Sequence, residues 1–148
     1  YKYSQNHITD GGGHIDISDI EWDSYSFSVN KEETGFNLVE TDPFQPVNLL
    51  PDETKSVVLY LKAENTFLAA VKDSSDGNSI FGASVRAYNL ALGYDNTLPT
   101  NEDGEAFFMP LDADTYNLEV TVSGYQDYSG NVNVLGDTTE TILLTPSP

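Results

Sequence analysis

The feature that most constrains this chain is an internal repeat. Residues 9–17, TDGGGHIDI, resemble residues 100–108, TNEDGEAFF, which lie 91 positions later. The same offset aligns Tyr3 with Tyr94, Gly13 with Gly104, Ile17 with Phe108, Ile20 with Leu111 and Tyr25 with Tyr116. After two extra residues in the first copy, Gly35-Phe36 aligns with Gly124-Tyr125, and later residues 48–54 align with 133–139. Matches in one order across about fifty residues predict two copies of one module.

In the second copy, the stretch Thr100–Tyr125 has the pattern of two strands separated by turns. An acidic turn at Asn101–Gly104 precedes Glu105–Met109, and Pro110–Asp114 then reverses the chain into Thr115–Val122. Both runs alternate apolar and polar residues, as half-buried antiparallel strands do, and Gly104 suits a turn position with positive φ. The pattern predicts an antiparallel strand pair joined at residues 110–114.

The rest of the chain also has the pattern of β structure, because no window sustains apolar residues at helical spacing. The predicted strands are Ile15–Ile17, Ser24–Val29, Gln45–Leu49, Ser56–Leu61, Thr66–Lys72, Ala83–Asn89, Ala106–Met109, Tyr116–Val122, Gly130–Val134 and Glu140–Leu144. Short strands at about ten-residue spacing, with Gly, Asp, Asn and Pro between them, are typical of a β-sandwich. The fold class predicted is all-β, with tandem sandwich modules.

The two copies are unequal. Residues 63–148 form a complete predicted module, whereas residues 1–62 lack counterparts of its first two strands, Phe67–Lys72 and Ile80–Tyr88. Without those strands, apolar side chains of the first copy would face water: Ile15, Ile17, Tyr25 and Phe27. An unpaired edge beside exposed apolar residues is prone to association. We therefore expect the missing strands to come from upstream sequence or, by strand addition, from another polypeptide.

Charge and composition limit the function. The chain has 6 Lys+Arg against 24 Asp+Glu, a net charge of −18, which argues against binding to nucleic acid or to anionic membranes. No apolar run is long enough to insert in a membrane. The chain lacks cysteine and begins at Tyr1 without a leader pattern, so either a leader has been removed or it is a piece of a longer protein.

The acidic turns raise the possibility of a calcium site, but an EF-hand register fails because its first position would be Pro99 or Lys72. Irregular binding by loop carboxylates, at Asp73, Asp76, Asp103, Asp112 and Asp114, is the alternative to simple turn capping. His14 and Asp16 alternate with Ile15 and Ile17, and we interpret them as surface residues. With two histidines, no cysteine and no Gly-x-Ser-x-Gly elbow, we predict no catalytic residues, metal or cofactor.

Four aromatic residues are candidates for surface contacts: Trp22, Phe44, Phe107 and Tyr128. Exposed aromatics on a sandwich can form protein–protein contacts or stack on sugar rings. Because the first copy must cover an incomplete edge, we favour contacts with protein, and carbohydrate binding is the alternative.

The second copy resembles the carboxypeptidase regulatory-like domain, a transthyretin-like, seven-stranded sandwich common in bacterial surface proteins. The residues that carry the resemblance are Val71-Lys72-Asp73, Gly82–Val85, the turn Thr100–Gly104, Leu111, Thr115–Leu118 and Gly124-Tyr125. The resemblance implies transthyretin-like or Ig-like modules that serve as spacers, adhesin stalks or appendage parts. Tandem copies also resemble surface proteins that carry a type IV pilin-like leader.

The related Cna-B-type pilus modules imply a Lys–Asn isopeptide bond, which this chain does not match. Val120 stands where those modules carry an acid, and the last strand, Thr141–Thr145, lacks the Asn. Together these observations predict a non-enzymatic structural subunit of a bacterial extracellular filament or cell-surface protein, with self-assembly or a strand-donating chain as partner. The alternatives are a carbohydrate-binding or adhesin module, or an accessory domain of a secreted enzyme.

Overall fold

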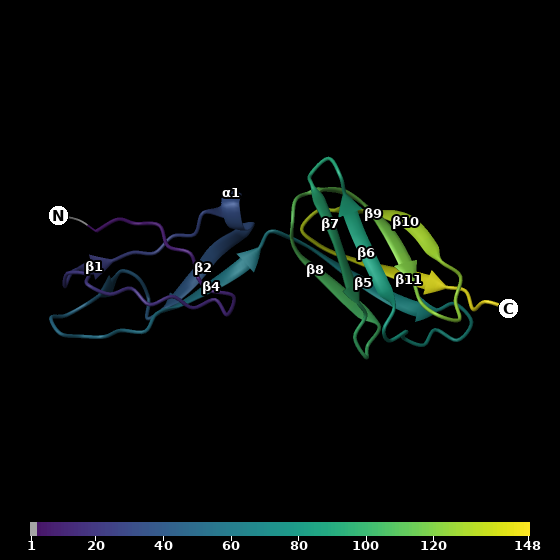
Figure 1. Cartoon of the computed structure of the whole chain (residues 1–148), viewed down its shortest axis with the longest axis horizontal. Helices are drawn as coiled ribbons and strands as arrows, with labels where there is room; N and C mark the ends of the chain where they lie inside the picture. The colour runs from purple at the N-terminus through teal and green to yellow at the C-terminus, as the bar shows by residue number, and fades with distance from the viewer. Residues whose placement is uncertain (1–2) are drawn as a thin grey trace. The chain divides into compact units, whose positions relative to one another are not determined.

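The computed structural model describes residues 3–148 and confirms the predicted all-β class (Figure 1). The chain divides into two compact units. The first unit contains residues 1–29 and 38–61, and the second contains residues 30–37 and 62–148. Among the described residues, no helix is long and apolar enough to cross a membrane.

The second unit is a sandwich of seven strands in two sheets (Figure 1). The strands are β5 (Asn65–Asp73), β6 (Ser84–Asn89), β7 (Tyr94–Pro99), β8 (Glu105–Leu111), β9 (Asp114–Thr121), β10 (Tyr128–Val134) and β11 (Asp137–Leu144). One sheet has the order β11-β5-β8 and the other has the order β10-β9-β6-β7. β5 pairs parallel with β11 and antiparallel with β8, whereas β6 pairs antiparallel with both β7 and β9. This architecture confirms the seven-stranded sandwich that the resemblance implied.

The alternation of apolar residues explains which side of each strand is buried. Along β5, Phe67, Ala69 and Val71 have no exposed surface, and they pack with residues of the opposite sheet such as Val85 and Leu118. The stacked rings of Phe67 and Phe108, with centroids 5.8 Å apart, fill the centre of this core. Because successive side chains of a strand point to opposite faces, one face of each sheet builds the core and the other meets solvent.

The predicted pairing of the two strands in Thr100–Tyr125 is wrong. β8 pairs with β5, and β9 pairs with β6 and β10, so residues 112–113 carry the chain from one sheet to the other. Both strands bury alternate residues, and alternation alone does not distinguish two strands of one sheet from two strands in facing sheets. Gly104 does have the expected positive φ, at 74°.

The last strand and the chain end are held by a polar cluster around Asp73. Its carboxylate accepts hydrogen bonds from the Ser75 amide at 2.6 Å, the Ser75 hydroxyl at 2.5 Å and the Tyr125 hydroxyl at 2.8 Å. Backbone bonds from Gln126 N to Thr145 O and from Ser147 N to Gly124 O join the β9–β10 loop to the segment after β11. The cluster thereby connects the end of β5 to both.

The first unit has much less regular structure. It holds β1 (Ser24–Tyr25), β3 (Val47–Asn48) and most residues of β2 (Phe36–Asp42) and β4 (Val58–Ala63). β1 pairs with β3 and β2 pairs with β4, in separate two-stranded sheets. A helix of four residues, α1 (Lys31–Thr34), belongs to the second unit; it follows the N-cap Asn30 and ends at Gly35, which adopts a φ of 73°. The sequence patterns did not predict α1, β2 or β7.

Hydrogen bonds show that the two copies are built alike where their contacts are local. Asp10 N donates to His14 O, and Gly13 N to Asp10 O; Asn101 N donates to Glu105 O, and Gly104 N to Asn101 O. The Asp10 carboxylate and the Asn101 amide oxygen each accept from the second and the fourth following amides.

Two tyrosine contacts repeat at the same offset. The Tyr25 hydroxyl donates to Glu21 O at 2.5 Å, and the Tyr116 hydroxyl donates to Asp112 O at 3.1 Å. Tyr3 meets Tyr25 edge-on with centroids 6.0 Å apart, as Tyr94 meets Tyr116 at 5.4 Å.

Strand register repeats as well. Tyr25 pairs with Val47 and Ser24 with Asn48, as Tyr116 pairs with Val132 and Thr115 with Asn133. β1 and β3 are therefore the counterparts of β9 and β10.

Adjacent phenylalanines allow a matched test of the core of the second unit. Phe108 is 1% exposed and Phe107 is 47% exposed, as expected for neighbours on a strand. We expect Phe108→Ala to lower the free energy of unfolding of this unit by about 3–5 kcal/mol, because it leaves a cavity against Phe67. Phe107→Ala, the control, should change it by about 0.5 kcal/mol. Equal effects in denaturant titrations would contradict the assignment of the two faces.

The Asp73 cluster predicts a pH dependence of stability. Hydrogen bonds from Ser75, and then from Tyr125, hold the pKa of the Asp73 carboxyl below its ordinary value of 3.8. A carboxyl with a lowered pKa in the folded state stabilises the fold above its unfolded-state pKa, and this contribution is lost as the pH falls through the folded-state pKa. We expect Asp73→Asn to lower the Tm at pH 7 and the difference from wild type to shrink below about pH 3.8.

Thermal scans from pH 7 to pH 2 measure this effect, with Asp127→Asn as the control. Asp127 is exposed, so its substitution makes the same change of charge on the surface of the same unit. A Tm difference for Asp73→Asn that stays constant across this pH range would contradict the prediction.

Candidate functional site

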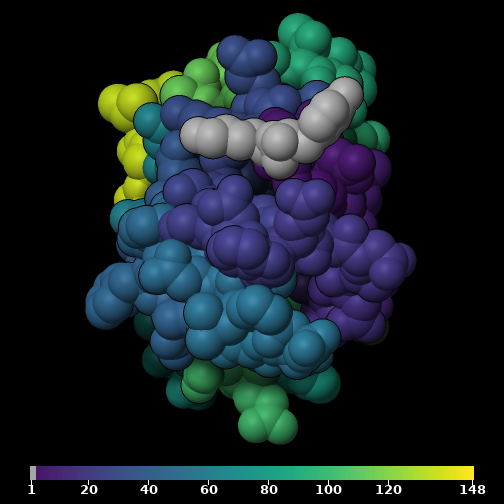
Figure 2. Space-filling model, turned by 90° about the vertical axis from the view of Figure 1, so that its left-hand side faces the viewer, coloured from purple at the N-terminus to yellow at the C-terminus, as the bar shows by residue number. Residues whose placement is uncertain are grey.

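Apolar side chains of the first unit are unusually exposed, and they form its candidate functional surface. Ten large hydrophobic residues are exposed here: Ile8, Ile15, Ile17, Trp22, Val39, Phe44, Leu50, Val58, Tyr60 and Leu61. Among the described residues of this unit, only Thr41 and Val47 are buried. Figure 2 shows the residues of the first unit in colours from purple to blue. Exposed apolar side chains in this number make the first unit a candidate for contact with protein.

Three segments of the first unit align with strands of the second unit but do not form strands. Residues 3–8 align with β7, residues 14–20 with β8, and residues 52–57 with the first part of β11. In the second unit, β8 and β11 pair with β5, and β7 pairs with β6. β5 and β6 are the two strands without counterparts in the first copy. Within residues 3–148, none of the three segments has the strand neighbour that its aligned strand has.

This result corrects several predicted strands. Ile15–Ile17 is not a strand, and both isoleucines lie on the exposed surface. Ser24–Val29 and Gln45–Leu49 shorten to β1 and β3, which pair only with each other. The alternating patterns are present, but a strand requires a hydrogen-bonded neighbour that the pattern does not supply.

The four predicted contact aromatics do not form one site. Trp22 and Phe44 belong to the first unit and are 70% and 77% exposed. In the second unit, Phe107 lies on β8 and Tyr128 on β10, in different sheets. Tyr128 is half-buried and packs against the core, and a Cβ on Gly130 would collide with its phenol ring. Phe81, 70% exposed, is an exposed aromatic that the sequence patterns did not single out.

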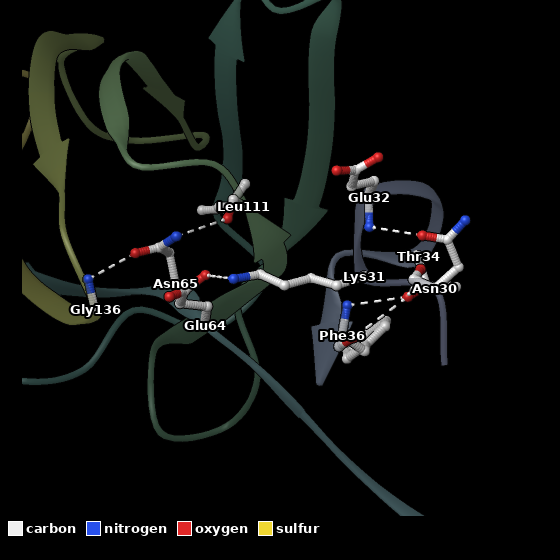
Figure 3. Close-up of polar contacts among 9 residues, drawn as sticks. All are labelled: Asn30, Lys31, Glu32, Thr34, Phe36, Glu64, Asn65, Leu111 and Gly136. Atoms are coloured by element: carbon white, nitrogen blue, oxygen red, sulfur yellow. Dashed lines mark hydrogen bonds and ion pairs between the residues drawn. The ribbon is translucent and has the colours of Figure 1, made fainter. Parts of the chain in front are cut away.

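A groove of about 790 Å³ in the second unit is a second candidate. It lies among α1, the start of β5, the β6–β7 loop and the β8–β9 turn, and Lys31 pairs with Glu64 at its rim (Figure 3). The Asn65 side chain donates to Leu111 O at 3.2 Å and accepts from Gly136 N at 2.8 Å. Because Asn65 is fully used in joining β5 to its neighbours, and both Lys31 and Glu64 are about half exposed, the groove has the character of ordinary surface.

One ionic cluster on the outer face of the four-stranded sheet was missed by the sequence analysis. Arg86 donates from Nε and Nη2 to the two carboxylate oxygens of Asp95 at 2.8 and 2.7 Å, and from Nη1 to Glu119 at 2.9 Å. Its guanidinium also lies 4.4 Å from the centroid of the Tyr88 ring. These bonds raise the pKa of Arg86, and the Arg86 bond lowers the pKa of Asp95. The cluster links three strands, β7, β6 and β9, through the hydrogen bonds of Arg86.

The acidic turns use their carboxylates locally. Asp10 and Asp76 accept from amides two residues later, and Asp73 binds Ser75 and Tyr125. Within residues 3–148, no group of three or more His, Asp or Glu side chains is arranged to hold a metal ion. His7 and His14 are both exposed on the first unit.

Several solved structures are similar to this chain at low identity. The minor pilin of the Gram-positive pathogen Streptococcus agalactiae is 17% identical over 69% of this chain and 59% of that one, with a TM-score of 0.48. A streptococcal ancillary pilin is 15% identical over 78% of this chain and 46% of that one, with a TM-score of 0.45. The Bacillus anthracis TIE protein is 14% identical over 61% of this chain and 20% of that one, with a TM-score of 0.47. The chain thus spans less than two thirds of each of these proteins.

No protein of curated function matches the chain. The model of the carboxypeptidase regulatory-like domain matches residues 68–145, which is more than half of the chain and nearly all of the second unit. This match agrees with the seven-stranded architecture of that unit. The chain belongs to the carboxypeptidase regulatory-like domain family.

Proposed function

We propose that this chain is a non-enzymatic structural part of a bacterial cell-surface protein or extracellular filament. In this proposal the second unit is a self-sufficient module, and the first unit is completed by strands from outside residues 1–148. The observation that carries the proposal is the contrast between the two units: the second has a continuous core, and the first leaves ten large apolar side chains exposed. The surface location is supported by the family to which the chain belongs.

The energetics of the first unit support completion from outside. Burying an apolar side chain contributes about 1.5–3 kcal/mol, and ordering the backbone of one residue costs about 1–2 kcal/mol. A unit with one buried apolar residue, Val47, does not offset the cost of ordering its own backbone. Thr41 adds to the cost because its hydroxyl is buried without a hydrogen-bond partner. Added strands would supply apolar contacts and main-chain bonds together.

A mechanical role suits the chemistry of the described residues. The ionic cluster around Arg86 joins three strands through its own hydrogen bonds. The Asp73 carboxylate joins the end of β5 to Tyr125. These charged groups stabilise the sheets, and the acidic outer faces keep neighbouring molecules apart in solution.

Hydrogen exchange of the full chain tests the proposal. We expect the amides of residues 14–20 and 26–29 to exchange with little protection, while amides of β5 exchange only on unfolding of the second unit. Trp22 is the single tryptophan, and at 70% exposure it should emit at long wavelength and be quenched by acrylamide. Protection of residues 14–20 equal to that of β5 would contradict an incomplete first unit. A saturable shift of Trp22 emission on titration with glycans would instead support the carbohydrate alternative.

A further inference from the structure

We infer that the first unit accepts one two-strand segment that resembles β5 and β6. Each strand of this segment joins a different sheet of the completed first sandwich. This inference rests on the proposed function, in which strands from outside residues 1–148 complete the first unit. It adds which strands these are, where they pair and which side chains they carry. Every other strand of the second unit has an aligned segment in the first: residues 3–8, 14–20, 24–29, 47–49 and 52–59.

Each of the two missing strands has a neighbour on both of its edges in the second unit. β5 lies between β11 and β8, and β6 lies between β9 and β7. They are consecutive in the chain, joined by residues 74–83. A single segment therefore supplies an inner strand to each sheet, which explains why one omission leaves residues 3–8, 14–20 and 52–57 all without strand structure.

The space for β5 is visible at the repeated turn. A Cβ placed on Gly104 would lie 2.6 Å from the carbonyl oxygen of Val71 on β5 and 3.0 Å from Ile80 N. A Cβ placed on Gly13, the counterpart of Gly104, meets no atom within 4 Å. The two turns have the same hydrogen bonds and nearly the same φ, 78° and 74°, so the difference is the strand beside them.

Among residues 3–148, the backbones of Ser26 and Ser28 make no hydrogen bond, which leaves the edge for β6 free. Phe27 N donates to the Gln45 side chain at 2.7 Å, on the side where β3 pairs with β1. Since successive residues of an antiparallel strand direct their backbone groups to opposite sides, Ser26 and Ser28 present theirs to the other side. In the second unit that side of β9 is occupied by β6.

The register of β5 and β6 specifies the side chains of the added segment. Val85 and Ala87 of β6 lie opposite Val120 and Leu118, the counterparts of Val29 and Phe27. Phe67 and Ala69 of β5 lie opposite Phe108 and Ala106, the counterparts of Ile17 and Ile15. The added segment should alternate, with an aromatic or large aliphatic residue facing Ile17 and small apolar residues facing Ile15, Phe27 and Val29.

The first unit lacks the two carboxylates that bind Arg86 in the second unit. Asp95 and Glu119, which bind Arg86, are replaced by Ser4 and Ser28 in the first copy. An arginine at the Arg86 position of the added segment would therefore have no carboxylate partner in the first unit. We expect the natural segment to carry an uncharged residue there.

A graft into the full chain tests the inference. Residues 65–93 are copied in front of Tyr3 in place of residues 1–2, with Arg86→Thr in the grafted copy, so that β5, β6 and their loop precede Tyr3 as they precede Tyr94. The matched control carries Ala87→Lys in the same graft, because Ala87 faces the core with no exposed surface. We expect exchange of residues 14–17 and 26–29 to slow at least about a hundredfold in the first graft and to remain unchanged in the control.

The outcomes separate this inference from the proposed function. Rapid exchange of residues 14–17 and 26–29 in the original chain and in both grafts would overturn the β5–β6 assignment while leaving an incomplete first unit. Protection that rises with concentration in the original chain, without a graft, would show that a second copy fills the surface and would also overturn the assignment. Strong protection in the original chain at every concentration would refute the proposed function itself.

Discussion

The pairing of β5 on both of its edges is the interaction on which the folded module depends. β5 bonds to β11 and β8, and alternate residues along it, including Phe67, Ala69 and Val71, have no exposed surface. Backbone groups of a strand need partners, and each added neighbour satisfies those of two strands at once. Where β5 and β6 have no counterpart, segments with the same pattern remain without strand structure.

Features that depend on local contacts could be predicted from the sequence. The alignment of Gly13 with Gly104 and of Tyr25 with Tyr116 corresponds to shared turns, hydroxyl bonds and strand register. These contacts join residues a few positions apart, so a repeated pattern is enough to repeat them. The all-β class and the second sandwich followed from the same alternation and turn residues.

Features that depend on distant strands could not be predicted in this way. Alternation in Glu105–Leu111 and Asp114–Thr121 shows that each strand has a buried face, but β8 and β9 bury theirs from opposite sheets. The Arg86 cluster draws on β6, β7 and β9, and only a strand order would have placed Asp95 and Glu119 beside Arg86. Alternation also does not show that Phe107 and Tyr128, two of the predicted contact aromatics, lie in different sheets.

The acidic residues of the first unit limit which strands can pair with it. Between residues 9 and 23, Asp10, Asp16, Asp19, Glu21 and Asp23 flank the exposed isoleucines of the segment that aligns with β8. Unpaired strand segments with apolar side chains promote promiscuous pairing, and charged neighbours oppose it. Two copies of this segment would bring ten carboxylates together, whereas an added strand without acidic residues would meet little repulsion. The charge therefore permits completion by a strand pair such as β5 and β6 and disfavours completion by a second copy of the open face.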